Sequence, residues 1–253
     1  MSYVVCIVVV APLRREAEHR SEMVSQLLLG EFAEVLEVSS DFFRVRCIYD
    51  GYEGWCQRKQ MEVMEEILLT DRYLQEGIQY IKVNNQFCRI SMGTPLYDTP
   101  VQFKNTLIDY KMDGVSPCKP EFTATAIGKM AGEFINTPYS WGGKSIFGID
   151  CSGFTQQIFK LFDIKLPRDA WQQAESGELV GFLQLVKCGD LAFFDNAEGR
   201  ITHVGILLDN EHIIHSSGKV SIDKIDNEGI INTNTGLRTH HLRIIKRYKD
   251  LKG

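Results

Sequence analysis

The sequence has no excess of positive charge. Its 28 Lys and Arg residues are interleaved with 33 Asp and Glu residues, so the formal net charge is -5 at pH 7. Binding to a phosphate backbone depends on a basic stripe or patch. The charge pattern therefore argues against nucleic acid as a partner.

The sequence also lacks a long apolar run. The stretch at residues 4–11 is too short to span a bilayer, has no Lys or Arg before it and lacks a small-residue cleavage site. We expect a first β-strand there and no membrane span. A cytoplasmic location is expected, or a periplasmic or secreted one if a signal peptide preceded this sequence.

No CxxC pair occurs. The seven cysteines are odd in number and widely scattered: Cys6, Cys47, Cys56, Cys88, Cys118, Cys151 and Cys188. This pattern favours a reducing compartment and argues against a structural zinc site. A chain of 253 residues can bury a core without disulfides, and we expect no cofactor and no metal.

Short apolar runs broken by polar turns fill residues 1–70. They lie at 3–10, 32–38, 42–48 and 54–56, with a turn signal at Asp50-Gly51, and predict a small β-barrel. Residues 71–120 are interpreted as a linker or as an incomplete second unit, with residues 93–98 as its opening strand.

A second domain is predicted at residues 121–253, after Pro117 and Pro120. Helical spacing occurs at 124–135 and in a helix that starts near Asp150 or Cys151. Strands of an antiparallel sheet are expected at 191–194, 204–208, 212–215 and 242–248. Helices followed by strands indicate the α+β class.

Cys151 is the candidate nucleophile. A helix N-terminus favours a thiolate, and the small neighbours Ser152 and Gly153 leave the sulfur accessible. Backbone N–H groups there could also form an oxyanion hole. The alternative is that Cys151 is a small buried hydrophobic residue.

A base for this thiol is offered by His203 and His215, which flank a predicted hairpin. A three-residue tip at 208–210 would pair the two histidines on one face, so that His215 fixes the tautomer of His203. A zinc site of Cys151, His203 and His215 is the alternative. The remaining histidines are interpreted as having no role: His19, His212, His240 and His241.

Six motifs in one order resemble the NlpC cell-wall peptidase family. They are Tyr139-Ser140-Trp141-Gly142-Gly143, Asp150-Cys151-Ser152-Gly153-Phe154, Pro167-Arg168-Asp169, Gly189-Asp190-Leu191, His203-Val204-Gly205-Ile206 and His215-Ser216. The resemblance implies a papain-like catalytic domain in which Cys151, His203 and His215 are nucleophile, base and third polar residue. The turn at Gly51-Tyr52-Glu53-Gly54-Trp55 resembles the bacterial SH3-like domain over residues 1–70.

The resemblance also implies a substrate. Relatives with an N-terminal SH3-like domain cut the bond between γ-D-glutamate and a diamino acid in short murein tripeptides or tetrapeptides. The family positions that line the pocket fall on Asp169, which would meet the free ammonium of L-alanine, and on Ser152 and Tyr139. Trp141 would form an apolar wall, although Tyr139 and Trp141 could instead be core residues. We expect a monomer.

Two barrel residues are further candidates for the substrate site. Glu16 follows the first strand, with Glu22 as an equal rival, and Tyr52 lies in the aromatic turn. Each could equally be a plain surface residue. They would matter if the barrel closed one end of the cleft, which would restrict the enzyme to turnover fragments with free amino ends.

Two other functions remain open at this point. One is a thiol acyltransferase or amidase with the same papain-like chemistry, which acyl-ester substrates would reveal through a burst of acyl-enzyme. The other is a binding module for wall peptides in which the Cys/His set is inert. The intact Cys151, His203 and His215 favour an enzyme.

Overall fold

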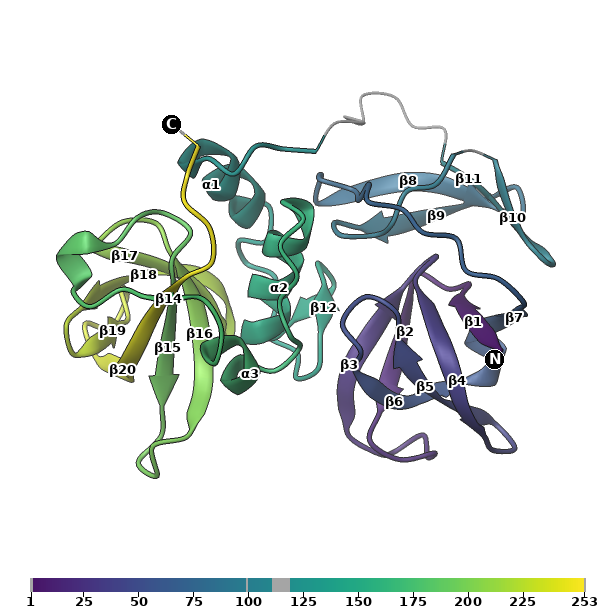
Figure 1. Ribbon diagram of the computed structural model, residues 1–253, viewed down its shortest axis with the longest axis horizontal. Helices are drawn as coiled ribbons and strands as arrows, with labels where there is room; N and C mark the ends of the chain where they lie inside the picture. The colour runs from purple at the N-terminus through teal and green to yellow at the C-terminus, as the bar shows by residue number, and fades with distance from the viewer. Residues whose placement is uncertain (1, 99, 111–118, 253) are drawn as a thin grey trace. The chain divides into compact units, whose positions relative to one another are not determined.

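The computed structural model describes residues 2–98, 100–110 and 119–252 (Figure 1). Pro117 and Cys118, used above, lie outside the described residues. The chain divides into two compact units. The first contains Met1–Lys119 and Ser140–Gly148, and the second contains Pro120–Tyr139 and Ile149–Gly253. The segment Ser140–Gly148 thus belongs to the first unit, although it interrupts the second unit in sequence.

The first unit is built on a seven-stranded antiparallel sheet with the order β3-β2-β6-β5-β4-β1-β7. Its strands are β1 (Tyr3–Cys6), β2 (Val10–Arg14), β3 (Met23–Leu28), β4 (Phe32–Val38), β5 (Phe42–Cys47), β6 (Glu53–Gln57) and β7 (Met61–Met64), and the 3-10 helix η1 (Arg58–Gln60) precedes β7. The runs predicted at 32–38, 42–48 and 54–56 correspond to β4, β5 and β6. The run predicted at 3–10 is divided between β1 and β2.

Alternation of buried and exposed residues explains these strands. In β5, Val45 and Cys47 are buried while Arg44 and Arg46 face solvent, as expected for a sheet with one face on the core. The predicted turn after β5 is present, because Gly51 adopts a positive φ of 73° that L-residues disfavour.

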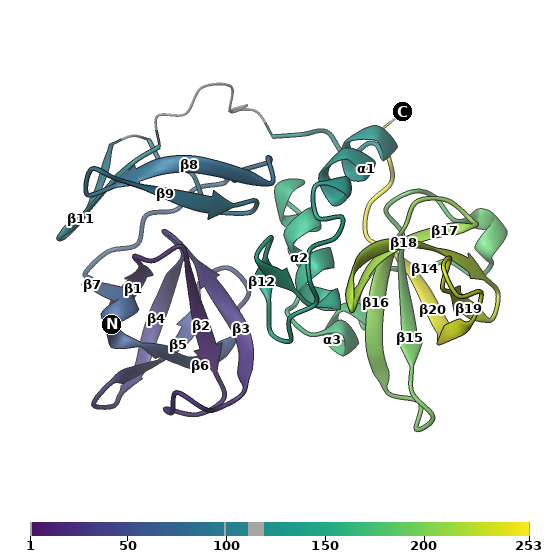
Figure 2. The ribbon, with the colours of Figure 1, turned by 180° about the vertical axis from the view of Figure 1, so that it is seen from behind.

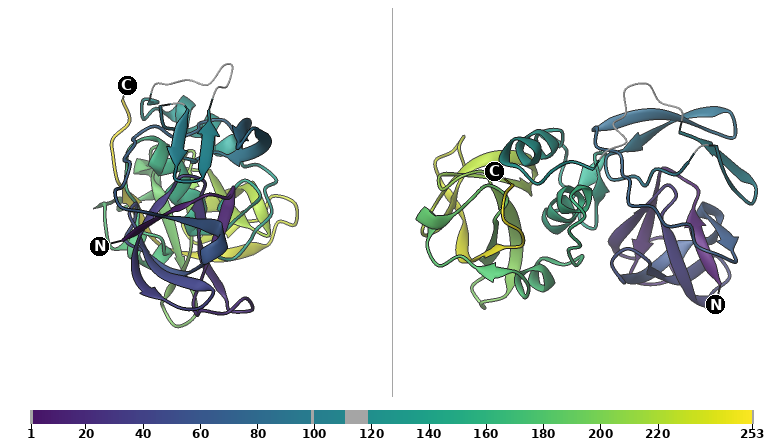
Figure 3. Two further views of the ribbon diagram at one scale, coloured as in Figure 1. Left: turned by 90° about the vertical axis from the view of Figure 1, so that its right-hand side faces the viewer. Right: turned by 45° about the horizontal axis from the view of Figure 1, so that its top comes forward.

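A four-stranded sheet completes the first unit, with the order β10-β11-β8-β9 (Figures 1 and 3). Its strands are β8 (Ile78–Val83), β9 (Gln86–Ser91), β10 (Val101–Phe103) and β11 (Thr106–Asp109). Asn84 and Asn85 both have positive φ and form the tight turn between β8 and β9.

The opening strand predicted at residues 93–98 is wrong. Gly93 has a positive φ of 84°, and this stretch makes only an isolated bridge between Tyr73 and Pro95. Proline lacks the N–H that a ladder needs. The Tyr97 hydroxyl instead donates to the Gly30 carbonyl at 2.8 Å. An incomplete second SH3-like unit within 71–120 stays a prediction.

Three helices lie in the second unit: α1 (Ala124–Gly132), α2 (Cys151–Leu161) and α3 (Ala170–Ala174). Thr123 caps α1 by accepting a hydrogen bond from the Ala126 N–H. The helix predicted at 124–135 therefore begins as expected and ends earlier, at Gly132. Within the described residues, no helix has the length and apolar character needed to cross a membrane.

The strands of the second unit close into a six-stranded barrel, seen from behind in Figure 2. They are β15 (Leu191–Asp195), β16 (Ile201–Leu207), β17 (His212–Ser217), β18 (Lys219–Asp226), β19 (Gly229–Ile231) and β20 (Arg238–Arg247). Pairing of β19 with β20 closes the barrel. The four strands predicted here correspond to β15, β16, β17 and β20, whereas β18 and β19 were missed.

Short elements complete the chain. They are β12 (Lys144–Ser145), β13 (Gly148–Ile149), β14 (Glu178–Leu179) and the 3-10 helix η2 (Leu183–Leu185). Helices followed by antiparallel strands in the second unit agree with the α+β expectation, and the papain-like arrangement stays a prediction.

The hairpin of β16 and β17 has a three-residue tip, as predicted, but the register differs. Gly205 lies opposite His215, and the Leu208 N–H donates to the His212 carbonyl, so the tip is residues 209–211 rather than 208–210. The direct pairing of His203 with His215 is therefore wrong. An even shift of two residues keeps both on one face as diagonal neighbours, so the expected contact survives.

Candidate active site

The start of α2 carries Cys151. Asp150 is the N-cap residue, and its Oδ1 accepts a hydrogen bond from the Gly153 N–H at 2.7 Å. The cap fixes the first turn of the helix, and Cys151, the first helical residue, is buried. The position predicted for the nucleophile is thus held by local structure.

The N-cap residue Asp150 also forms a buried ion pair. Arg168 Nη1 donates to Asp150 Oδ1 at 3.0 Å and to Ser152 Oγ at 2.9 Å. All three side chains are almost fully buried. Ser152, predicted to line the substrate pocket, therefore also has a structural partner. Arg168 is part of one of the six predicted motifs, but the sequence indicated no role for it.

His203 in β16 and His215 in β17 lie in contact, as predicted. His203 Nε2 and His215 Nδ1 are 2.8 Å apart. On the other side of the ring, His215 Nε2 is 3.0 Å from Oδ2 of Asp223 in β18. A buried chain of two imidazoles and a carboxylate results.

Asp223 was missed because its strand was missed. The alternation of Val220, Ser221, Ile222 and Asp223 could have indicated a strand, but it would have placed Asp223 on the polar face, whereas Asp223 is buried and Ile222 is exposed. Its Oδ1 also accepts the backbone N–H of Thr233 at 2.7 Å.

His240 in β20, interpreted above as having no role, packs against this chain. Its ring stacks on that of His203, with centroids 4.1 Å apart and an interplanar angle of 24°. Burial, followed by the charge of His215, lowers the pKa of His240 to about 4. A neutral aromatic ring therefore covers one face of His203.

Burial dominates the protonation of both reactive groups. It raises the pKa of Cys151 to about 12, helped by the charge of Asp150 and opposed by a hydrogen bond to the Val204 backbone. Burial, then repulsion from His215 and His240, holds the pKa of His203 well below its usual value. The helix start predicts a thiolate, yet the site favours a neutral thiol beside a neutral imidazole at pH 7.

Tyr139 lies close enough to Cys151 for a charge on that sulfur to act on the phenol. Burial raises the pKa of the Tyr139 phenol, and the charges of Cys151 and Asp150 add to the effect. The Tyr139 N–H donates to the Gly218 carbonyl at 2.9 Å, and Tyr139 bridges to Ile149. The Tyr139 hydroxyl therefore stays protonated at neutral pH, and backbone contacts fix the position of the residue.

Asp169 is the N-cap residue of α3. Its backbone N–H donates to Oε1 of Gln172 at 3.4 Å, within a capping box. The side chain is half-buried. Its predicted contact with the ammonium of a substrate stays a prediction.

The segment Ser140–Gly148 is tied to the first unit. Lys144 donates its backbone N–H to Gln26 Oε1 at 2.7 Å, and its ammonium lies 3.8 Å from Oδ2 of Asp50, with both side chains about 1% exposed. Ile146 donates its backbone N–H to Ser91 Oγ at 2.9 Å. The first unit thereby holds a stretch of chain that ends three residues before Cys151.

Trp141 in this segment is no core residue, since it is 60% exposed. Its Nε1 donates to Glu22 Oε1 at 2.7 Å. This bond distinguishes Glu22 from its rival Glu16, which is exposed and whose backbone N–H donates to Ser21 Oγ.

Tyr52 lies between β5 and β6 and packs against the hydrophobic core of the first unit. Its side chain is partly buried, and its backbone N–H donates to Oδ1 of Asp50 at 3.0 Å. The predicted contacts of Tyr52 and Glu16 with a substrate stay predictions.

Three histidines could be considered as metal ligands. Nitrogens of His203, His215 and His240 lie within 4.8 Å of one another, but two of them, 2.8 Å apart, share a hydrogen bond. Zn–N bonds of about 2.0–2.1 Å would require those rings to separate. Cys151 is not part of this group among the described residues, so the geometry suits a hydrogen-bonded chain better than a metal.

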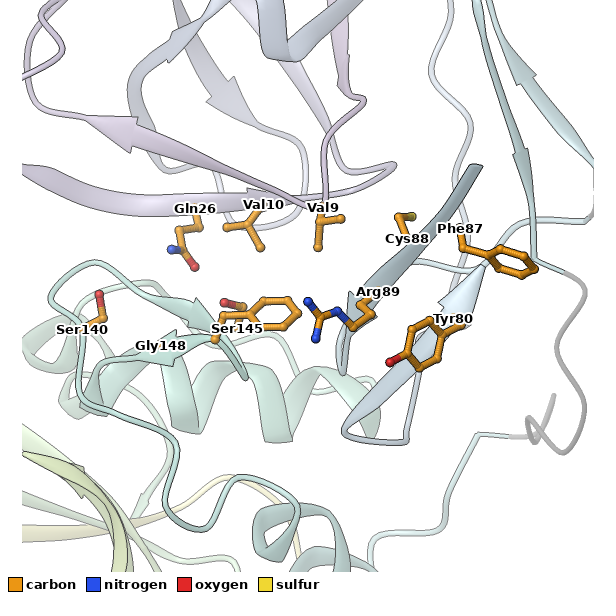
Figure 4. A pocket seen from close by; sticks show the side chains of 11 residues that line it. Val9, Val10, Gln26, Tyr80, Phe87, Cys88, Arg89, Ser140, Ser145 and Gly148 are labelled. Atoms are coloured by element: carbon orange, nitrogen blue, oxygen red, sulfur yellow. The ribbon is translucent and has the colours of Figure 1, made fainter. Parts of the chain in front are cut away.

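A cavity of about 660 Å³ lies within the first unit (Figure 4). Gln26 and Val10 line it together with Tyr80 and Arg89 of the four-stranded sheet and Phe147 of the segment Ser140–Gly148. None of the predicted catalytic or substrate-binding residues lines it. The cavity therefore shares no lining residue with the predicted active site.

Comparison with known families gives two matches. Residues 136–239 match the NlpC/P60 family, and residues 13–61 match the bacterial dipeptidyl-peptidase SH3 domain. The first match contains Cys151, His203, His215 and Asp223.

Curated relatives cover most of the chain. A γ-D-glutamyl-L-lysine dipeptidyl-peptidase of Bacillus cereus is 28% identical over 87% of this chain and 76% of its own length. The enzyme of the same name from Bacillus subtilis is 42% identical over 66% of this chain and 60% of its own length.

A solved structure shares the fold. The crystal structure of an NlpC/P60 family protein from Bacillus cereus superposes with a TM-score of 0.76. It covers 97% of this chain and 99% of its own chain at 22% identity. This likeness shows that the two chains share a fold.

Proposed function

Because this chain belongs to the NlpC/P60 family and is a cysteine peptidase, we propose that it hydrolyses the bond between γ-D-glutamate and a diamino acid in short murein peptides. The names of the Bacillus relatives support this choice of bond. The observation that carries the proposal is the buried contact of His203 with His215 beside the helix that starts at Cys151.

Attack on the peptide begins with a neutral pair. The Cys151 thiol gives its proton to His203 as the sulfur adds to the carbonyl carbon, since the pKa values of both groups disfavour a preformed ion pair. The imidazolium then protonates the leaving amine, and water releases the acyl group. General-base transfer during attack replaces a stable thiolate.

The oxyanion of the tetrahedral intermediate needs donors. The Tyr139 hydroxyl stays protonated near Cys151, and the Cys151 backbone N–H, in the first turn of α2, has no acceptor within the helix. Donors fixed in advance stabilise the developing charge. We assign both groups to the oxyanion hole.

Asp169 is the proposed anion for the free ammonium of L-alanine. The capping box at the start of α3 fixes its position. An ammonium taken out of water needs such a partner. The preferred substrates are therefore murein tripeptides or tetrapeptides with free amino ends, which places the enzyme in the turnover of wall fragments.

A substrate panel tests the proposal. We expect purified protein to release L-Ala-γ-D-Glu from L-Ala-γ-D-Glu-diaminopimelate and L-Ala-γ-D-Glu-Lys, and to leave the N-acetylated peptides intact. Mass spectrometry identifies the products. Equal cleavage of free and acetylated peptides would contradict the proposed ammonium site. Turnover of acyl esters alone would favour an acyltransferase.

A further inference from the structure

A carboxylate lies at the far end of the histidine pair. Asp223 is 4% exposed, and its Oδ2 is 3.0 Å from Nε2 of His215. The nearest acceptor for a proton on that nitrogen is thus an oxygen fixed in the barrel wall.

The two oxygens of Asp223 differ in their shortest contacts. Oδ1 accepts the backbone N–H of Thr233 at 2.7 Å, while Oδ2 faces His215 and lies 3.4 Å from Ser221 Oγ. Asn232 Nδ2 lies 3.5 Å from each oxygen. The hydrogen bond from His215 is the largest cause that lowers the pKa of Asp223, to about 2. The carboxylate is therefore ionised at neutral pH and only accepts hydrogen bonds.

The Asp223 carboxylate, which only accepts hydrogen bonds, determines which ring nitrogen of His215 and of His203 carries the proton. His215 must carry its proton on Nε2 to donate to Asp223, so its Nδ1 has a lone pair. That lone pair accepts from His203 Nε2, 2.8 Å away, and the proton of neutral His203 is then on Nε2. Its Nδ1 is left unprotonated.

We propose that Asp223 is a positioning residue that fixes the tautomer of His203 through His215, so that Nδ1 of His203 is the base for the Cys151 thiol. The inference rests on the proposed role of His203 as general base. During attack the S–H bond breaks and its proton goes to His203 Nδ1. Asp223 gains no proton and stabilises the imidazolium through the His215 ring.

Asp223→Asn should reverse the direction of the hydrogen bonds that run from residue 223 through His215 to His203. The Thr233 N–H donor keeps the amide oxygen on its own side, so the amide NH2 faces His215 Nε2. His215 then carries its proton on Nδ1 and donates to His203 Nε2, which moves the His203 proton to Nδ1. A protonated Nδ1 cannot accept from the thiol.

The test is the tautomer itself, read from histidine 15N chemical shifts without substrate. Wild type should show His203 protonated on Nε2, and Asp223→Asn should show it protonated on Nδ1. The matched control is Asp226→Asn on the same strand, whose carboxylate pairs with Arg238; it should keep the wild-type tautomer. A His203 that carries its proton on Nδ1 in wild type would overturn the proposal even if the variants failed to fold.

Kinetics provide the second readout. Asp223→Asn should lower kcat by roughly 100-fold or more at unchanged KM, by analogy with wrong-tautomer variants of other hydrolases, while Asp226→Asn keeps wild-type rates. Unchanged kcat in Asp223→Asn would reject the inference while wild-type hydrolysis still supported the proposed function. Absence of hydrolysis by wild type would reject the proposed function, and the tautomer would still test the inference.

Discussion

The seven-stranded sheet of the first unit and the start of α2 place their charged side chains differently. In the first unit, Arg44 and Arg46 pair with Glu53 on the exposed face of the sheet. In the second unit, Arg168 pairs with Asp150 almost out of contact with water. Surface pairs contribute little to stability, whereas a buried charge requires its partner. The buried pairs therefore mark where the second unit must hold side chains in fixed positions.

The segment Ser140–Gly148 shows the same difference within the first unit. Its Lys144 forms a buried pair with Asp50, unlike the exposed pairs of the neighbouring strands. The first unit thus has a buried charge in the stretch that leads directly to Cys151. Buried ion pairs therefore lie both at the start of α2 and in the segment that precedes it.

The largest effect should come from the base. His203→Ala removes the proposed proton acceptor, and we expect kcat to fall by roughly a thousandfold or more, because nucleophile and base act together. His19→Ala, which removes a ring packed on Phe42 in the first unit, is the control and should keep the wild-type rate. A comparable loss in both variants would break the distinction between the units. Turnover of the tripeptide, followed by chromatography, measures both.

Buried and exposed arginines should differ in stability. Arg168→Met leaves Asp150 buried without its charge partner, and we expect the free energy of unfolding to fall by about 3–5 kcal/mol. Arg46→Met in the exposed pair should change it little. Urea unfolding monitored by circular dichroism measures the difference. Equal losses would contradict the contrast drawn from burial.

Glu22 of the first unit accepts a hydrogen bond from Trp141, the proposed apolar wall of the substrate pocket. Glu22→Gln weakens this charge-assisted bond, and kcat/KM for the free tripeptide should fall roughly tenfold, mainly through KM. Glu16→Gln is the matched control and should have no effect. If Glu16→Gln alone raised KM, Glu16 rather than Glu22 would be the residue of the first unit that contributes to substrate binding.

The acid limb of kcat should reflect the lowered pKa of His203. Because its neutral form persists below the usual histidine pKa of about 6.5, activity should be kept at that pH and lost only as pH falls through the lowered pKa. An acid limb centred above 6.5 would show that burial does not control His203. Initial rates at saturating substrate between about pH 4 and pH 8 provide the profile.

The sequence predicted the elements with strong local signals. The helix at Cys151 and the strands β4, β5 and β16 follow from clear periodicity and capping, and His203 and His215 were placed on one face. The register itself was wrong by two residues, because any odd-length tip satisfies the pattern. Non-local pairing decides between such tips, and sequence alone does not show it.

Other parts of the site depend on long-range contacts. Asp223 contacts His215 across two strands, and His240 reaches His203 only because β20 closes the barrel. The bond from Trp141 to Glu22 joins residues 119 positions apart. No local pattern marks these side chains, although motif resemblance had already indicated Trp141 and Arg168.

The central claim is tested most directly by the sulfur of Cys151. The measurement is release of L-Ala-γ-D-Glu from the diaminopimelate tripeptide by wild type and by Cys151→Ala, with folding of the variant verified by circular dichroism. We expect rapid release by wild type and none above background by the folded variant. Release at the wild-type rate by Cys151→Ala would contradict the account.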